Sequence, residues 1–380
     1  MKAFIRICPV YAKPASSTSS RLLVHRRKFS SSRQGLSASD PRAVADAFLN
    51  KFSNGQTFVR RQLLDANQLR LFALTLDRPQ LWLGSTRSSK TLEEVEPPSG
   101  TPIPPAYHLI YFTPAQLPGI LGLDGTDASF NPESPFTRRM WAGGSCHWPG
   151  ADPNSASPAL LRVGELATEV TKVLSCEPKV IKKTGESMLV VGVEKEFRNR
   201  KDELCVLDRR NWVFRPALDP SKPASLVPKP AELSSAELDE VAQGKIVREY
   251  SRSEATLFRF SALTFNAHRI HYDKPWATEV EGHRNVVVHG PMNLIAILDL
   301  WRDETGSQEQ MVGSTAAAMA TAQENLVFPQ SIEYRATSPV YAGEAYRVVM
   351  DEAAVGNKEA KVRVVSNDGT VCMKGTVNGW

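Results

Sequence analysis

The sequence predicts an α+β protein built from two tandem copies of one domain. Three observations support this prediction: short patterns that recur in the same order, a proline-rich segment between the copies, and alternating strand patterns that close each copy. A chain of 380 residues also exceeds one ordinary domain, because roughly 150 residues per domain is typical. We therefore expect two similar domains in one chain.

The recurring patterns indicate a duplication. Residues 69–77 read LRLFALTLD and residues 258–266 read FRFSALTFN, with the same Arg, Ala, Leu and Thr in matching places. The other matched pairs are 114–123 with 291–300, and 158–165 with 339–344. The order is kept and the period is far longer than that of a solenoid repeat, which favours two copies of a domain over an array.

The segment between the copies is predicted to be an extended linker. Residues 215–230 read RPALDPSKPASLVPKP, and five prolines exclude a helix or a central strand. We assign residues 40–215 to an N-terminal domain, residues 216–234 to the linker and residues 235–380 to a C-terminal domain.

Each copy is expected to place a helix first and antiparallel strands after it. In the second copy, Leu294, Ile297, Leu298 and Trp301 recur at helical spacing after Gly290 and predict a helix that is apolar on one side. Alternating segments predict strands at 345–350, 361–365 and 370–376, with turns at 356–357 and 368–369, and in the first copy at 166–174, 188–197 and 203–214. One helix against such a meander is an α+β arrangement.

Residues 1–39 have a different composition and are predicted to be a mitochondrial transit peptide. They hold eight Lys and Arg, many serines and no acidic residue, and a disordered basic tail is the alternative. Without these eight residues the 46 basic side chains become fewer than the 41 acidic ones, so the basic pI does not argue for nucleic-acid binding. The sequence has no apolar run of about 18 residues, so it predicts no membrane span. The five scattered cysteines favour reduced thiols over disulfides.

A dense polar cluster is the strongest functional signal. Residues 260–273 read FSALTFNAHRIHYD and residues 286–291 read VVVHGP, so that four of the seven histidines lie between His268 and His289. Three interpretations compete: a zinc site, histidines satisfied within a polar turn, and acid–base catalysis. Helical zinc motifs place their histidines four residues apart, which His268 and His271 do not match. The helix start at Gly290 favours catalysis, because free N–H groups there can stabilise an oxyanion.

These residues resemble the type 2 enoyl-thioester hydratase and MaoC-like dehydratase superfamily, whose hotdog fold wraps an antiparallel sheet around a long helix. Residues 270–277 (IHYDKPWA) match its signature, and the 266–273 pattern is similar to fungal mitochondrial 3-hydroxyacyl-thioester dehydratase type 2 and to mesaconyl-CoA hydratases. The runs 138–144 and 208–215 also resemble the first half of those proteins. The resemblance implies a double hotdog in which only the second domain is catalytic.

The resemblance also implies roles for individual residues. His271 takes the place of the catalytic histidine, and Gly290 N–H that of the oxyanion donor, in the His289–Gly290 pair. The family's catalytic Asp falls at Asn266 and its Asn at His268, so these two are expected to orient the leaving water or share a proton relay. His289 and Asp273 are expected to bind substrate. Asp273 is also expected either to fix an imidazole tautomer or to have only a structural role. The first copy has Asp77 opposite Asn266 but no histidine opposite His268 or His271.

The implied activity is dehydration of (3R)-3-hydroxyacyl thioesters in mitochondrial fatty-acid synthesis in the matrix, with no cofactor, metal, nucleic acid or membrane partner. Two alternatives remain: hydration of a short dicarboxylic enoyl-CoA of the mesaconyl type, and a non-catalytic protein that binds acyl thioesters. A carboxylate substrate would need an arginine, for which Arg138, Arg139 and Arg269 are candidates. Acyl chain length, the carrier (acyl carrier protein or CoA), the cleavage site of the leader and a homodimer of double-hotdog chains stay open.

Overall fold

The structure, a computed structural model, describes residues 40–52, 56–82, 90–182, 184–234, 243–312, 326–351 and 358–380. The predicted transit peptide and the predicted turn at 356–357 lie outside these residues. All elements named below belong to one unit, Ser39–Trp380.

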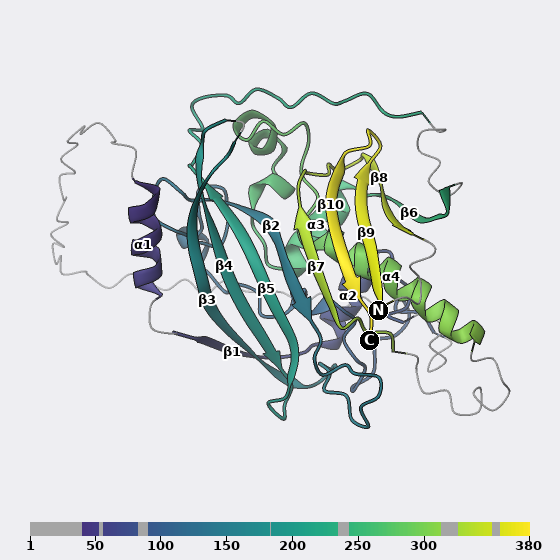
Figure 1. The fold of residues 1–380 in the computed structure, drawn as a ribbon. Helices are drawn as coiled ribbons and strands as arrows, with labels where there is room; N and C mark the ends of the chain where they lie inside the picture. The colour runs from purple at the N-terminus through teal and green to yellow at the C-terminus, as the bar shows by residue number, and fades with distance from the viewer. Residues whose placement is uncertain are drawn as a thin grey trace, which may run out of the picture. The chain divides into compact units, whose positions relative to one another are not determined.

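Ten strands of the described residues form one antiparallel sheet in the order β1-β3-β4-β5-β2-β7-β10-β9-β8-β6 (Figure 1). Their bounds are β1 Phe58–Leu63, β2 Arg138–His147, β3 Leu166–Val180, β4 Ser187–Arg198, β5 Leu204–Arg215, β6 Lys245–Ser251, β7 Ser331–Ala336, β8 Ala345–Asp351, β9 Glu359–Ser366 and β10 Val371–Asn378. The order reads the same from both edges when β1 is matched with β6, β3 with β8, β4 with β9, β5 with β10 and β2 with β7. The predicted strands and the predicted duplication are thus confirmed.

The two copies share this sheet through the pairing of β2 with β7, in register from Gly143 opposite Arg335 to His147 opposite Ser331. A side chain at Gly143 could not fit there, because its Cβ would lie 2.4 Å from the carbonyl oxygen of Tyr334. Close approach of the two backbones therefore depends on glycine at the seam. The sequence patterns predicted no strand at the position of β2.

The helices are α1 Pro41–Lys51, α2 Ala66–Thr75, α3 Glu254–Leu263 and α4 Gly290–Val312, with short turns at Tyr107–Ile110, Pro118–Ile120, Arg269–His271 and Trp276–Val280. The repeated pattern of residues 69–77 and 258–266 lies in α2 and α3. These two helices contact each other, with the rings of Phe72 and Phe260 centred 5.4 Å apart. Each begins at a side-chain cap, Asp65 or Ser253, that accepts a hydrogen bond from a backbone N–H.

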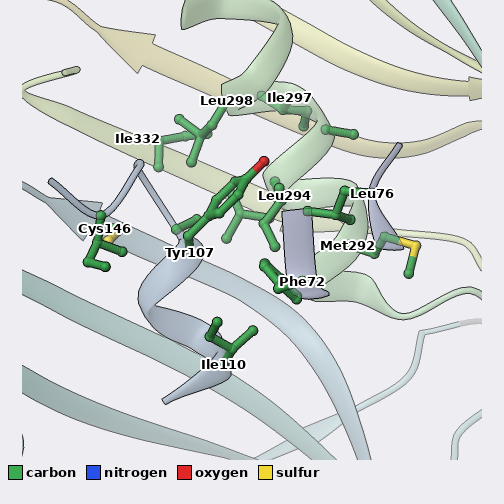
Figure 2. Packing of buried hydrophobic residues seen from close by; sticks show 14 of the residues in the cluster. Phe72, Leu76, Tyr107, Ile110, Cys146, Met292, Leu294, Ile297, Leu298 and Ile332 are labelled. Carbon is green, nitrogen blue, oxygen red and sulfur yellow. The ribbon is translucent and has the colours of Figure 1, made fainter. Parts of the chain in front are cut away.

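Helix α4 is the central helix of the second copy. Its prediction is confirmed, but its first turns are buried on all sides and not on one. Met292, Leu294, Ile297 and Leu298 are all less than 4% exposed and pack with Phe72, Leu76, Tyr107 and Ile110 of the first copy (Figure 2). A helix that is apolar all round belongs in the interior, and here both copies supply the walls.

Residues 114–123 of the first copy match the start of α4 in sequence but do not form a corresponding helix. Only the short turn Pro118–Ile120 forms there, and Leu117, Ile120 and Leu123 are 75%, 58% and 67% exposed. Proline at 118 lacks an N–H, and glycines at 119 and 122 weaken a helix further. The first copy instead packs α1 against β3 and β4, where Val44, Ala45 and Phe48 join a second apolar core.

The linker, residues 216–234, has no helix or strand, as expected of a proline-rich segment. It runs along the second copy, where Ala224 N–H donates to Glu279 and Val227 N–H donates to the carbonyl of Gly282, both at 2.8 Å. Among the described helices, none combines the length and apolarity needed to cross a membrane.

Candidate active site

A large cavity lies between the polar cluster of the second copy and the sheet of the first. Its volume is about 1490 Å³, which exceeds that of most small-molecule sites. His271, His289 and Gly290 line it from the second copy, and Trp141 and Trp212 line it from the first. Both copies therefore contribute to the same cavity.

His271 is held as a neutral base at this cavity. It ends the turn Arg269–His271 and is buried, with Nδ1 2.7 Å from the carbonyl oxygen of Val287. A carbonyl only accepts, so Nδ1 carries the hydrogen and Nε2 keeps a free lone pair. Burial, and next the neighbouring His268, lower the pKa of His271 to about 3. The ring is thus uncharged near neutral pH and can accept a proton.

His289 stacks on His271 and is fixed from the other side. The two ring centroids are 3.6 Å apart with the planes inclined by 20°. His289 Nε2 lies 2.9 Å from Ser261 Oγ, and Phe260 packs against the ring with centroids 4.6 Å apart. Burial, and next His271, hold its pKa well below the ordinary value. Its buried Nδ1 has no hydrogen-bond partner among the described residues.

Gly290 begins helix α4 next to these rings. The first amides of a helix have no preceding carbonyl within the helix to bond, and the helix dipole makes this end positive. No loop or turn carbonyl among the described residues takes up the Gly290 N–H. One turn further, Asn293 lines the cavity, and its buried Oδ1 has no hydrogen-bond partner in the described chain. The helix start can therefore bind a ligand oxygen.

His268 stands edge-on to His271, with ring centroids 5.3 Å apart and planes at 82°. Its Nε2 is buried and makes no hydrogen bond to a described residue. Two carboxylates lie just beyond hydrogen-bond range of this atom, Asp124 Oδ2 at 3.7 Å and Glu281 Oε1 at 3.9 Å. Neither acid was singled out from the sequence.

Asn266 shapes the turn that carries these histidines. Its Oδ1 accepts a hydrogen bond of 3.1 Å from His268 N–H. This arrangement, an Asx turn, leaves the Nδ2 donor of Asn266 for other partners, and the residue lines the cavity. The first-copy residue in the matching place, Asp77, has positive φ.

The expectation that Asp273 fixes an imidazole tautomer is wrong, because the carbonyl of Val287 does so for His271. The Asp273 carboxylate instead accepts hydrogen bonds from the Arg269 guanidinium at 2.7 and 2.9 Å and from Trp276 N–H at 3.1 Å. Asp273 is also absent from the cavity lining. It joins the Arg269–His271 turn to the next turn and so supports the site from outside.

The structure therefore brings together His271, His268, His289, Asn266 and Gly290, as the sequence predicted, and leaves Asp273 outside the cavity. Sequence reasoning missed Ser261, Glu281 and Asp124. Ser261 and Glu281 lie within or next to the predicted motif, so a search for polar residues there would have found them. Asp124 belongs to the other copy and has no signal in the sequence. Within the described parts of the chain, no group of three His, Cys, Asp or Glu side chains converges as a metal site would.

A family model supports the interpretation of this site. The model of the hydroxyacyl-thioester dehydratase type 2 family matches residues 106–342, more than half of the chain. The match spans the seam strand β2, the linker and the whole polar cluster. It ends next to the turn before β8.

Individual relatives agree with the family model. A mesaconyl-C(4)-CoA hydratase from Chloroflexus aurantiacus is 34% identical over 221 residues, which cover 56% of this chain and 70% of the relative. The mitochondrial hydroxyacyl-thioester dehydratase type 2 of Schizosaccharomyces pombe is 23% identical over 280 residues, covering 66% and 79%. The crystal structure of a MaoC-like dehydratase from Phytophthora capsici superposes with a TM-score of 0.53 at 15% identity, covering 88% of this chain and 98% of that one. The predicted double-hotdog fold is thereby confirmed.

Proposed function

This chain belongs to the hydroxyacyl-thioester dehydratase type 2 family, which makes it a hydro-lyase, and from that premise we propose that it dehydrates (3R)-3-hydroxyacyl thioesters to trans-2-enoyl thioesters. The acyl group is carried on acyl carrier protein or CoA, and the reaction belongs to mitochondrial fatty-acid synthesis. The relative from Schizosaccharomyces pombe supports both parts of the proposal, since its name states the activity and the compartment.

One observation carries the proposal: a neutral, oriented histidine base beside the free N–H at a helix start. His271 keeps its Nε2 lone pair because Nδ1–H donates to Val287. Gly290 begins α4 in the same cavity wall. A base and an oxyanion donor in one cavity are what removal of a proton next to a thioester carbonyl requires.

The chemistry follows from these two groups. His271 Nε2 takes the α-proton, and the electrons of the broken C–H bond form an enolate whose oxygen binds Gly290 N–H at the positive end of α4. The enolate electrons then form the Cα=Cβ double bond while the Cβ–O bond breaks. The departing hydroxide leaves as water with the proton that His271 returns. Asn266 Nδ2 donates to the β-oxygen, and His268 Nδ1 accepts from the β-hydroxyl, so that both hold this group until it departs.

The first copy supplies the acyl pocket in this proposal. Phe52, Phe58, Phe130 and Trp212 line the cavity away from the histidines and contact one another, with ring centroids 5.5 to 6.1 Å apart. Burial of an acyl chain against such rings is favourable. The first copy lacks histidines at the matching positions and is non-catalytic in the proposal.

Kinetics of the His271→Ala variant test the proposal. With a (3R)-3-hydroxyacyl-CoA as substrate, the wild-type chain is expected to form the enoyl thioester, followed by its ultraviolet absorbance, and His271→Ala is expected to lose at least about a hundredfold in kcat. His147→Ala is the matched control, because His147 lies on β2 outside the cavity. Near-wild-type turnover by His271→Ala would overturn the assignment of the base. Binding of the thioester without turnover by the wild type would favour the non-catalytic alternative.

The mitochondrial assignment has its own test. Residues 1–39 carry the acid-free basic composition of a transit peptide. A fluorescent fusion of the full chain is expected in the matrix, and a fusion that starts at residue 40 is expected to stay in the cytosol. Equal distribution of both fusions would contradict the transit peptide.

Hydration of a short dicarboxylic enoyl-CoA is a second candidate function, and two arginines favour it. Arg138 and Arg139 line the cavity, and burial lowers the pKa of both. Arg139 lies 3.9 Å from Asp127, and among the described residues no carboxylate is within ion-pair distance of Arg138. The third sequence candidate, Arg269, is paired with Asp273 and stacked on Trp276. The Chloroflexus aurantiacus relative is named for a dicarboxylic thioester.

Substrate comparison separates the two candidates. If the second is right, mesaconyl-CoA is turned over better than crotonyl-CoA, and Arg138→Gln or Arg139→Gln removes that preference, because a buried arginine pairs with a carboxylate. Arg259→Gln, on the exposed face of α3, is the control. If longer 3-hydroxyacyl thioesters are preferred and neither variant changes the ratio, the first candidate holds.

A further inference from the structure

His268 faces two carboxylates that come from different copies. Asp124 Oδ2 and Glu281 Oε1 lie 3.7 and 3.9 Å from its Nε2. His268 is 7% exposed, and its Nε2 has no hydrogen-bond partner among the described residues. A buried ring nitrogen that is aimed at two acids and bonded to neither is an unusual arrangement, because buried polar atoms are normally paired.

Asp124 is held in place by its own loop. Thr126 donates from its backbone N–H and its hydroxyl to Asp124 Oδ1, at 3.0 and 2.6 Å, so that Oδ2 remains for His268. The loop is pressed onto the second copy, since Arg269 N–H donates to the Asp124 carbonyl at 2.8 Å. At Gly125, a Cβ would lie 2.0 Å from the carbonyl oxygen of Ala267. The docking of this first-copy loop thus depends on glycine.

Glu281 is held by a different device. It follows the π-helical turn Trp276–Val280, and its Oε1 accepts a hydrogen bond of 2.9 Å from Trp276 Nε1. Its Oε2 lies 4.0 Å from His283 Nε2, and His283 Nδ1 is 3.3 Å from the Tyr341 hydroxyl. Burial opposes ionisation of Glu281, but the nearby His268 and the hydrogen bond from Trp276 lower the pKa of its carboxyl. Glu281 is therefore a charged, immobile neighbour of His268.

We infer that Asp124 and Glu281 are positioning residues that hold the His268 ring with hydrogen on Nε2, so that Nδ1 accepts a hydrogen bond from the β-hydroxyl of the substrate. The inference rests on the proposed dehydratase function and deepens it. According to this inference, the first copy contributes Asp124 to the reaction, in addition to the residues that line the acyl pocket.

The arrangement answers a chemical need of this chain. Asn266 stands where the resembling superfamily has an acid, and an amide neither gains nor loses a proton near neutral pH. Its Oδ1 is occupied by His268 N–H. The negative charge near the β-oxygen therefore comes from Asp124 and Glu281, acting through His268. The other charged or titratable groups that act on this trio are Arg138, Arg139, His271, His283 and His289.

Charge-removing variants of nearly unchanged shape test the inference. Glu281→Gln keeps an oxygen for Trp276 Nε1, and Asp124→Asn keeps one for Thr126. Each is expected to lower kcat for a 3-hydroxyacyl-CoA at least about tenfold with KM within about twofold, as loss of an orienting carboxylate does. Glu279→Gln is the matched control, because Glu279 is an exposed acid on the same turn. Unchanged kcat in both Asp124→Asn and Glu281→Gln would overturn the inference.

A double-mutant cycle shows whether the acids act through His268. The double variant His268→Gln/Glu281→Gln is expected to have the same kcat as His268→Gln alone. Additive losses in kcat would show that Glu281 does not act through His268 and would overturn the inference.

The ring ¹⁵N signals of His268 give a second readout that needs no turnover. They should show hydrogen on Nε2 in the wild type and lose that preference in the Asp124→Asn/Glu281→Gln double variant. If the wild type shows that signal but dehydrates no 3-hydroxyacyl thioester, the proposed function fails and the positioning of His268 stands. If it dehydrates the thioester and the signal is the same in both proteins, the inference alone fails.

Discussion

The indole of Trp141 packs directly against Gly290. Its Cδ1 lies 3.2 Å from the place that a Cβ at residue 290 would occupy. Trp141 comes from β2 of the first copy, where it stacks on Tyr334 with centroids 6.2 Å apart, and the Arg210 guanidinium lies 5.4 Å from the centroid of its ring. Gly290 begins α4 of the second copy. The first copy therefore closes one side of the candidate oxyanion site.

Gly290→Ala is expected to lower kcat/KM about a hundredfold, as loss of one oxyanion donor does. The new methyl group would crowd Trp141 and obstruct the approach of a thioester oxygen to the N–H. The backbone at residue 290 is not in the left-handed region, so alanine fits its conformation, and any fall in Tm should come from the tight contact with Trp141. Steady-state kinetics and thermal unfolding measured on the same sample check both parts. Wild-type kinetics would show that the N–H at residue 290 is not the donor.

Asn266→Asp separates two roles of this side chain. A carboxylate still accepts the hydrogen bond from His268 N–H and keeps the turn, but it cannot donate to the β-oxygen as Nδ2 does. We expect kcat about tenfold lower at unchanged Tm, in keeping with one lost hydrogen bond. An increase in kcat would instead mean that an acid at this position works as the general base, as in the wider superfamily.

Stability should fall in mild acid because His271 is buried uncharged. Its ordinary pKa of 6.5 applies to the unfolded chain, and about 3 to the folded one. Between these values only the unfolded chain binds the proton. The contribution of neutral His271 to the free energy of unfolding is therefore complete above about pH 6.5 and is lost as pH falls toward 3. At pH 5.5 the loss is on the order of 1 kcal/mol for this histidine. Urea unfolding measures the free energy of unfolding at pH 7.5 and 5.5. The difference between the two values should be smaller for His271→Gln than for wild type by this amount.

Ser261→Ala should loosen His289. The hydroxyl of Ser261 is 2.9 Å from His289 Nε2, and both residues are buried. Leaving this nitrogen without a partner is expected to cost about 1–3 kcal/mol of unfolding free energy. Chemical denaturation measures the loss, and Ser253→Ala, at the exposed cap of the same helix, should cost only about 1 kcal/mol. A cost for Ser261→Ala below that of the cap would contradict the pairing.

Asp303 of α4 ties the two copies together through buried charges. Its oxygens accept from Arg78 of the first copy at 2.7 and 2.8 Å and from Arg248 of β6 at 2.8 Å. Asp303→Asn leaves two arginines undercompensated and is expected to cost about 3–5 kcal/mol. The neighbouring Glu304→Gln should cost less than about 1 kcal/mol, because that side chain is 34% exposed and lies 3.6 Å from Arg248. Equal costs in urea unfolding would refute a special role for Asp303.

Much of the architecture was predictable because its causes are local. Alternation of apolar and polar residues placed the strands β3, β4, β5, β8, β9 and β10, and helical spacing after Gly290 placed α4. The recurrence of one pattern in α2 and α3 revealed the duplication. Residues 114–123 show the limit of such similarity, because they match the α4 segment but their proline and glycines do not allow a corresponding helix.

The candidate site was likewise predictable where its causes are local and not elsewhere. The motif of residues 266–290 placed His271, His268, Asn266 and Gly290 near one another, since short turns leave neighbours in the chain close in space. Asp273 was misjudged because adjacency in sequence does not say which way a side chain points. Its carboxylate faces Arg269 and Trp276 and not the cavity.

Periodicity, turn chemistry and motif spacing thus suffice to specify the elements, the duplication and the histidine cluster, since each arises from residues close together in the chain. Only the packing of the two copies settled that Asp124 faces His268, that Trp141 closes the site at Gly290, and that Val287 orients His271. Asp124 and Trp141 are far from their partners in sequence, and they meet because glycines at 125 and 143 let two backbones approach more closely than any side chain would allow.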